Sequence, residues 1–160
     1  DQHSEEVTTI IAMSDNIFVS GSNDKTIKIW KASDTFSIFA AVTSLEEHKG
    51  GVTCLCKVNT DYFLSGSRDK QILMWSLNQR KCLLKISNQG GHYGMITGIC
   101  RLSNTQFASC STDNSVKIWD IKTDTCIQTI GKNVHVEAIC SLNNQILVYG
   151  NYKQLKIYKR

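Results

Sequence analysis

The chain has 160 residues, enough for one domain with a sizeable core, and its 41% hydrophobic and 20% charged residues are typical of a globular protein. It contains no proline and no run of 18 apolar residues, which excludes collagen-like, Pro-rich and membrane-spanning helical classes. The net charge of +4 comes from scattered single bases rather than basic runs, so a nucleic-acid-binding role is not indicated.

The chain begins with the polar, acidic residues DQHSEE, which lack the pattern of a secretory or transit signal. Its seven cysteines are odd in number and include no CxxC pair. Both features favour free thiols in a reducing compartment. We therefore expect a cytoplasmic location, with the nucleus as the alternative.

Four similar units then follow one another along the chain. The clearest segments are GSNDKTIKIW at 21–30, GSRDKQILMW at 66–75 and CSTDNSVKIW at 110–119, with a weaker copy, GNYKQLKIY, at 150–158. A second register runs in parallel, because His3, His48 and His92 each precede a threonine by five residues. A repeat of about 40–45 residues indicates a solenoid or a propeller.

Each unit consists of short apolar runs with alternating polarity, which predicts strands. In the second unit these runs are VTCLCKV, YFLSGS, QILMWSL and KCLLKIS. Clusters such as SNDK, SRDK and STDN separate the second run from the third and are typical of tight hairpins. The fourth unit ends after its third run, at LKIYKR. We therefore expect three four-stranded units and a fourth with three strands.

The pattern of a His followed by Ser-Gly-Ser-x-Asp-x-x-Ile-x-Ile-Trp resembles the WD-repeat β-propeller family. The resemblance implies an all-β propeller of four-stranded antiparallel blades, here part of a larger ring. The fourth copy departs from the pattern, because Lys132, Tyr152 and Tyr158 replace its His, Asp and Trp. The blades are expected at 3–47, 48–91, 92–131 and, degenerate and incomplete, 132–160.

The resemblance also implies a hydrogen-bond network in each blade, in which the His contacts the turn Asp and a strand Ser, and that Ser contacts the Trp indole. A buried indole N–H needs an acceptor and a buried imidazole needs a partner at each nitrogen. The implied sets are His3, Ser20, Asp24 and Trp30; His48, Ser65, Asp69 and Trp75; and His92, Ser109, Asp113 and Trp119.

The polar network residues and the cysteines each have a second interpretation. Ser, His and Asp are also the members of a hydrolase triad, but a threefold repeat with a Trp partner favours a structural role, and no Gly-x-Ser-x-Gly elbow is present. Cys54 and Cys56 share one face of a strand and would be able to touch a metal. The aligned column of Cys56, Cys100 and Cys140 accepts Ile11 in the first unit, which favours packing. We expect no cofactor, no metal and no catalytic activity.

In the family, the residues after each His and before each turn Asp lie on one rim of the central channel. Tyr, Met and Arg at such places are typical of protein interfaces. The candidate partner-binding residues are Glu6, Lys49, Arg68, Tyr93, Met95 and His135.

The leading functional prediction is a scaffold that binds protein or peptide partners through these rim loops. The alternative is a substrate-recognition subunit of a ubiquitin ligase that reads phosphorylated or basic peptides. A phosphopeptide reader needs an arginine cluster, and only Arg68 is expected on the rim. A phosphoinositide-binding relative would need adjacent arginines, and the sequence has no Arg-Arg pair.

Four repeats leave the completion of the ring open. The family usually uses more than four blades, and propellers in general have about 4 to 8. Three arrangements are compatible with the sequence: a segment of a larger propeller, a closed four-bladed ring, and a half ring completed by another copy. In an open arc the outer faces of the first and last blades lack a neighbour, so we expect the isolated chain to self-associate or to be poorly soluble.

Overall fold

Within residues 2–32, 39–86, 90–130, 136–142, 145–150 and 153–159, which the computed structural model describes, the chain forms fifteen β-strands and no helix. The strands form four antiparallel sheets, and within each sheet neighbouring strands follow one another in the sequence. The predicted all-β architecture of consecutive blades is therefore confirmed. No helix in the described part of the chain has the length and apolar character needed to cross a membrane.

The first three blades have four strands each. Blade 1 contains β1 (Val7–Ser14), β2 (Ile17–Ser22), β3 (Ile27–Ala32) and β4 (Phe39–Leu45). Blade 2 contains β5 (Val52–Lys57), β6 (Tyr62–Ser67), β7 (Ile72–Ser76) and β8 (Lys81–Ile86). Blade 3 contains β9 (Ile96–Arg101), β10 (Gln106–Ser111), β11 (Ser115–Asp120) and β12 (Thr125–Ile130).

Blade 4 has three strands within the described residues. They are β13 (Ala138–Leu142), β14 (Ile146–Gly150) and β15 (Leu155–Lys159). In this blade Leu147 pairs with Tyr158, at the place where blade 1 pairs Phe18 with Trp30. The sequence segment LKIYKR thus contains the third strand, as expected from the repeat.

In blades 1 to 3 the hairpins between the second and third strands are stabilised by their aspartates. The carboxylate of Asp69 accepts a hydrogen bond from the backbone N–H of Gln71 at 2.9 Å, which closes a local turn. The residue after the aspartate, Lys70, has a left-handed backbone with φ 73°. Lys25 and Asn114 take the same conformation at the corresponding places, so the turn geometry is repeated in three blades.

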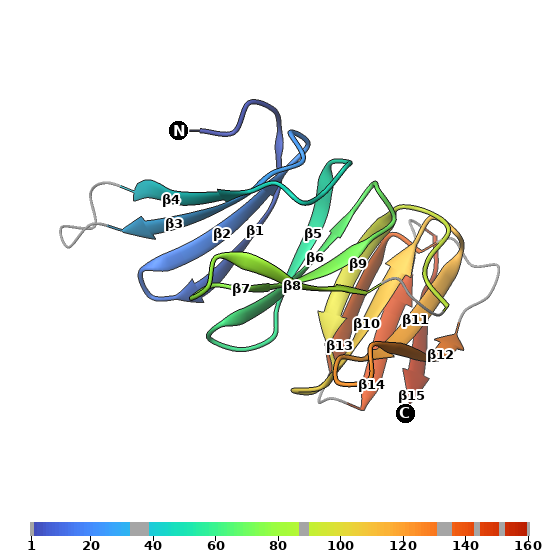
Figure 1. Ribbon diagram of the computed structural model, residues 1–160. Coiled ribbons are helices and arrows are strands. Elements are labelled where there is room, and N and C mark those ends of the chain that lie inside the picture. Colours follow the sequence, from blue (N-terminus) through green and yellow to red (C-terminus); the bar gives the residue numbers. More distant parts are fainter. Residues whose placement is uncertain are drawn as a thin grey trace.

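The core lies between the blades. The innermost strands β1, β5, β9 and β13 pack successively against one another around the arc (Figure 1). Each junction joins the back face of one blade, built on its second and third strands, to the front face of the next. That front face carries a Phe–Trp pair in blades 2 and 3 and the Leu147–Tyr158 pair in blade 4. The junction of blades 1 and 2 contains Met13, Val19, Ile27 and Ile29 from blade 1 and Val52, Leu55, Phe63 and Trp75 from blade 2.

Polar side chains also cross each junction. The hydroxyl of Thr8 donates to the carbonyl oxygen of Val52 at 2.5 Å, and Thr53 donates in the same way to Ile96 at 2.6 Å. The third threonine of this register, Thr97, bonds the carbonyl of blade 4 at residue 136 over 2.8 Å. These bonds explain the threonine register seen in the sequence.

The arc is open, and the two end blades lie at opposite ends of the molecule (Figure 1). On the front face of blade 1, Ile10 is 62% exposed. On the back face of blade 4, Leu155 is 79% and Ile157 70% exposed. Blades 1 and 4 therefore do not pack on each other, and the closed four-bladed ring is not the arrangement in this structure.

Candidate interaction surface

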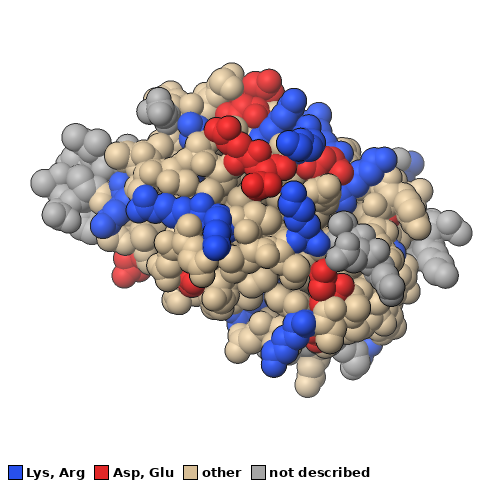
Figure 2. Space-filling view, viewed as in Figure 1, with Lys and Arg blue, Asp and Glu red and all other residues tan. Residues whose placement is uncertain are grey.

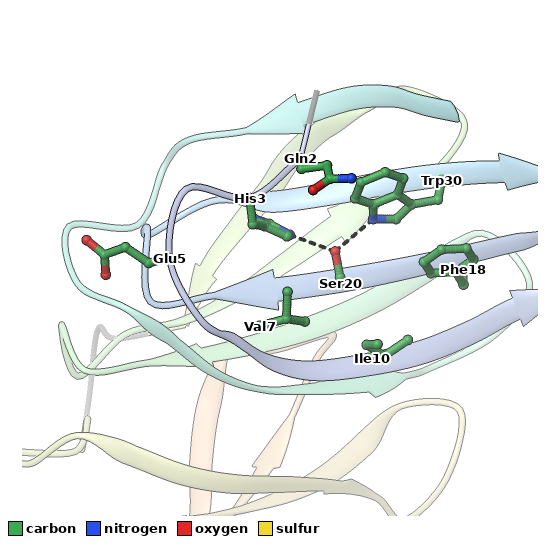
Figure 3. A pocket seen from close by; sticks show the side chains of 8 residues that line it. All are labelled: Gln2, His3, Glu5, Val7, Ile10, Phe18, Ser20 and Trp30. Atoms are coloured by element: carbon green, nitrogen blue, oxygen red, sulfur yellow. Dashed lines mark hydrogen bonds between the residues drawn. The ribbon is translucent and has the colours of Figure 1, made fainter. Parts of the chain in front are cut away.

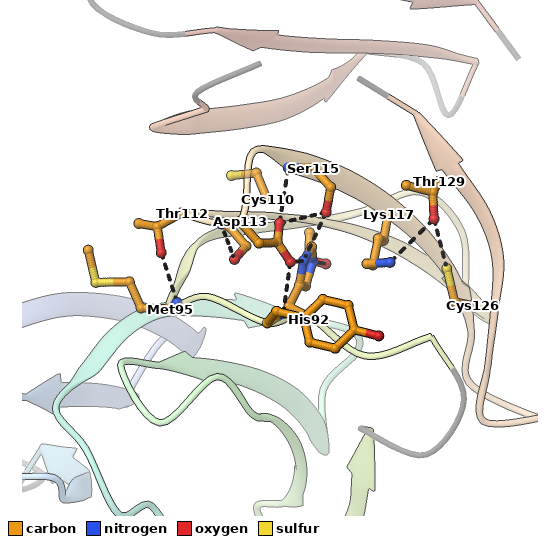
Figure 4. Close-up of polar contacts among 12 residues, drawn as sticks. His92, Met95, Cys110, Thr112, Asp113, Ser115, Lys117, Cys126 and Thr129 are labelled. Carbon is orange, nitrogen blue, oxygen red and sulfur yellow. Dashed lines mark hydrogen bonds and ion pairs between the residues drawn. The ribbon is translucent and has the colours of Figure 1, made fainter. Parts of the chain in front are cut away.

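Blade 3 shows the hydrogen-bond network that positions its rim loop (Figure 4). His92 Nδ1 lies 2.8 Å from Asp113 Oδ2, and His92 Nε2 lies 2.7 Å from the hydroxyl oxygen of Ser109. The indole N–H of Trp119 donates to that hydroxyl at 2.8 Å. The loop before β9 is thereby joined to the β10–β11 hairpin.

The same contacts recur in blades 1 and 2 with nearly the same distances. The His–Asp distance is 2.8 Å, the His–Ser distance is 2.7 Å and the Trp–Ser distance is 2.7 Å in both blades. The structure thus brings together each set of four residues that the resemblance implied. The sets in these two blades are His3, Ser20, Asp24 and Trp30, and His48, Ser65, Asp69 and Trp75.

The donors and acceptors of this network match only one tautomer. Because the Ser oxygen accepts the indole N–H, its own proton is directed to Nε2 of the imidazole. The imidazole therefore carries its proton on Nδ1 and donates it to the carboxylate. Burial lowers the pKa of His92 and outweighs the opposing effect of Asp113, so the ring is neutral at pH 7.

The aspartates of the networks are held in their ionised form. Burial alone would raise the pKa of Asp69, but hydrogen bonds from His48 and from the backbone N–H groups of Lys49 and Gln71 outweigh it and lower the pKa to about 2. Asp113 also has its pKa lowered to about 2 against the effect of burial. The hydrogen bond between the neutral His92 and the ionised Asp113 orients the loop before β9.

Two further hydroxyl positions complete the network and were not predicted. Ser67 donates to the Gly50 carbonyl at 2.9 Å and accepts from the backbone N–H of Asp69 at 3.0 Å, so the second serine of the Ser-Gly-Ser motif secures the loop after His48. Ser115 donates to Asp113 at 2.6 Å, two residues beyond the turn aspartate. The first of these positions did have a signal in the sequence, because the serine two residues before the turn aspartate recurs in the repeats.

Six of the seven cysteines are buried or half-buried, and Cys140 of β13 is exposed. Burial raises the pKa of Cys54 and Cys100 to about 12 and that of Cys56 and Cys110 to about 11. These thiols are therefore protonated at neutral pH and pack as small apolar groups. Across the described residues, no three or more His, Cys, Asp or Glu side chains are grouped so as to hold a metal ion.

The network extends directly to the rim. The backbone N–H of Lys49 donates to the Asp69 carboxylate at 2.7 Å, and the backbone N–H of Tyr93 donates to Asp113 at 2.9 Å. The side chains of both residues are exposed, that of Tyr93 to 84%. The buried carboxylates thus hold the backbone of these loops, while the two side chains face solvent.

The rim continues from blade 1 to blade 2 without a break. The Glu6 carboxylate accepts a hydrogen bond from the Asn23 side chain at 3.1 Å. Gly51 of blade 2 lies against Asn23, because a Cβ on this glycine would be 2.8 Å from the Asn23 amide oxygen. The backbone N–H of Arg68 in turn donates to the Gly51 carbonyl at 2.9 Å.

The rim residues differ in chemistry from one blade to the next. Blade 1 contributes Glu6, blade 2 contributes Lys49 and Arg68, and blade 3 contributes Tyr93 and Met95, all of them exposed. Figure 2 shows acidic and basic side chains side by side at the upper edge of the molecule. The remaining candidate, His135, lies outside the described residues, as do Lys132 and Tyr152.

Comparison with known proteins adds two likenesses. A family model described as WD domain, G-beta repeat matches residues 1–31, 39–76 and 80–120. The crystal structure of the computationally designed Ika4 protein is similar to this chain, with a TM-score of 0.80 and 25% sequence identity over 99% of this chain and 94% of that one. No match was found among curated proteins.

Proposed function

Because the chain belongs to the WD40 family, whose repeats generally mediate protein interactions as scaffolds, we propose that it is a non-catalytic platform for protein or peptide partners. The proposed binding surface is the exposed rim formed by Glu6, Lys49, Arg68, Tyr93 and Met95. The single observation that carries this proposal is a rigid, buried network under each of three exposed rim loops.

The chemistry of the rim suggests the kind of partner. A segment lying across the three blades would meet a carboxylate at Glu6, then two cations at Lys49 and Arg68, then apolar area at Tyr93 and Met95. Arg offers a planar charged fork and Tyr offers broad contact area, the two types that dominate interface energetics. The best complement is a peptide that carries a basic, an acidic and an apolar residue in that order.

The substrate-recognition role in a ubiquitin ligase is the weaker candidate. Reading of phosphorylated peptides requires clustered arginines. In the described part of the rim Arg68 is the one arginine at a candidate position, beside Lys49. A cytoplasmic or nuclear location is proposed with the scaffold function, on the reducing compartment that the free cysteines favour.

A displayed library of random peptides selected on the full chain tests the proposed surface. We expect enriched peptides whose affinity falls at least about tenfold with Arg68→Glu and with Tyr93→Ala. Arg80→Glu is the matched control, because Arg80 is an exposed arginine in the β7–β8 turn, at the opposite end of the same blade.

Two results would contradict the proposal. One is the enrichment of peptides whose affinity is unchanged by both rim substitutions. The other is an equal loss of affinity with Arg80→Glu, which would indicate that charge alone, and not the rim, holds the peptide.

A further inference from the structure

The two open faces of the arc are the same two faces that meet at every internal junction. At the junction of blades 1 and 2, Ile27 and Ile29 on the back face pack with Leu55 and Trp75 on the front face. All four side chains are buried, and the most exposed of them, Leu55, is only 8% exposed. At this junction the back face of one blade therefore packs against the front face of the next.

Among the described residues, no blade packs on the front face of blade 1. Val7, Ile10, Phe18 and Trp30 line a hollow of about 400 Å³ on this face (Figure 3). Their equivalents in blade 2 are Val52, Leu55, Phe63 and Trp75, which cross-strand pairing places at the same positions. A large apolar face of this kind, exposed on a globular protein, marks an interaction surface.

The back face of blade 4 is open in the complementary way. Leu155 and Ile157 of β15 occupy the places of Ile27 and Ile29. Leu142 and Val148 add to this apolar face, with a hollow of about 280 Å³ beside Val148 and Leu155. The open back face of blade 4 thus corresponds to the face that, in each preceding blade, packs against the next blade.

Glycines define the register of this contact. A Cβ on Gly21 would lie 2.5 Å from Val52 Cγ1, so the valine of the next blade packs directly on the glycine backbone. A Cβ on Gly66 would lie 2.5 Å from Ile96 Cγ2 at the second junction. Gly150 of blade 4 occupies the position of Gly21, and Val7 of blade 1 occupies the position of Val52. The equivalence is one of strand register, because a Cβ on Gly150 would meet Gln154 and Leu155 of its own blade.

The charges of the end blades are also complementary. Residues 3–47 contain seven acidic and three basic residues, a net charge of −4. Residues 132–160 contain one acidic and five basic residues, a net charge of +4. Opposite charge on two surfaces favours their encounter and suppresses contact between like surfaces.

We infer that two copies of this chain pair head to tail, the front face of blade 1 of each copy packing on the back face of blade 4 of the other. One pairing covers all four open faces, because the two junctions are identical by symmetry. The product is a ring of two four-bladed halves, within the range of about 4 to 8 blades that propellers use. This inference does not depend on the proposed function, since it uses the blade faces and not the rim.

The junction between copies lacks two polar links of the internal junctions. Lys57 of blade 2 donates to the Met13 carbonyl at 2.7 Å, but the residue at its place in blade 1 is Ala12. Thr8 donates to the next blade, but the residue at its place in blade 4 is Glu137. The pairing is therefore weaker than the internal junctions and is reversible on dilution.

Sedimentation of the full chain over about 1–100 μM tests the pairing. We expect a reversible dimer of twice the 17.9 kDa chain mass, weakened by added salt. Ile10→Lys on the front face and Ile157→Glu on the back face should each raise the dissociation constant at least about tenfold. Ile127→Lys is the control, because Ile127 is a 49% exposed isoleucine on the outer strand β12.

Two further measurements establish the direction of pairing. A mixture of the Ile10→Lys and Ile157→Glu variants should associate more strongly than either alone, since one junction of the mixed pair is intact. Ala12→Lys with Glu137→Thr should tighten the dimer by restoring the polar links. Arg68→Glu should leave the dimer unchanged. A failure of the dimer inference can therefore be distinguished from a failure of the proposed rim function.

The pairing is overturned by a chain that stays monomeric over the whole range, or by a dimer that persists in either face variant. Oligomers that grow beyond the dimer with concentration would also overturn it, because they require a head-to-tail contact that does not close.

Discussion

At the scale of single residues, each network is a closed set of donors and acceptors. The Trp indole has only a donor, the carboxylate has only acceptors, and the Ser hydroxyl and the imidazole between them each donate one hydrogen bond and accept one. Removing any member leaves a buried polar group without its partner, which costs more than the bond itself contributes.

We expect His48→Ala and Asp69→Ala each to lower the free energy of unfolding by about 1–3 kcal/mol. The double variant should lose less than the sum, because both substitutions break the same 2.8 Å contact. Urea unfolding of the four proteins of the cycle measures the difference. His48→Ala combined with Asp113→Ala is the control and should be additive, since Asp113 belongs to another blade; additivity in both pairs would disprove coupling in blade 2.

The same groups predict how stability depends on pH. The pKa of Asp69 and of Asp113 is about 2 in the folded protein, against an ordinary 3.8, and the pKa of His92 lies below its ordinary 6.5. In all three the unfolded chain binds its proton at a higher pH than the folded chain does. Their contribution to stability is thus full above the unfolded pKa and is lost as the pH falls.

We therefore expect the urea midpoint to decrease from about pH 6.5 downward through His92, and more steeply between about pH 4 and pH 2 through the two aspartates. Asp69→Asn should flatten the lower part of this profile. A midpoint that is constant or rises on acidification would contradict this assignment.

The residue types of the network were predictable, because they recur at fixed offsets in the sequence. The hydroxyl of Ser115 was not, since its place is taken by Thr26 in blade 1 and by Gln71 in blade 2. Only Thr26 and Ser115 bond the aspartate through their side chains, whereas Gln71 uses its backbone N–H. A position that changes chemistry between copies gives no repeat signal.

At the scale of elements, the glycine of the second strand determines how closely neighbouring blades approach. We expect Gly66→Ala to lower the free energy of unfolding by about 1–3 kcal/mol, because its Cβ would lie 2.5 Å from Ile96 Cγ2 and 2.7 Å from Cys54 Sγ. Gly98→Ala is the matched substitution, with its nearest contact at 3.1 Å. Thermal unfolding of both variants compares them, and equal losses would show that the shorter contacts at Gly66 are not the cause.

Blade 4 is expected to be the least stable element. Tyr158 stands in place of the Trp and Tyr149 in place of the Ser, so the indole–serine contact of the other blades is missing here. Blade 4 also packs on a blade at one face only. Hydrogen exchange should be fastest across residues 132–160. Protection equal to that of residues 92–131 would show that the degenerate motif is a poor guide to local stability.

At the scale of the whole molecule, the repeat predicted the number and order of the sheets but not the shape of the assembly. Alternation and turn residues specify a strand and its neighbour, which are local in the sequence. Whether the ends of the arc meet depends on the angle between successive blades, which no single residue encodes. The exposure of Ile10 and Ile157 supplied this information.

The stepwise contact pattern also has a consequence for how the chain folds. Every sheet pairs strands that are consecutive in the sequence, and the threonine bonds between blades join residues only 39 to 44 positions apart. In such a topology no long loop has to close before contacts form. The loss of chain entropy on folding is therefore divided among many short loop closures. A chain leaving the ribosome can complete blade 1, then dock blade 2 on it, and continue in order. Synthesis from the N-terminus thus follows the order in which the core is built.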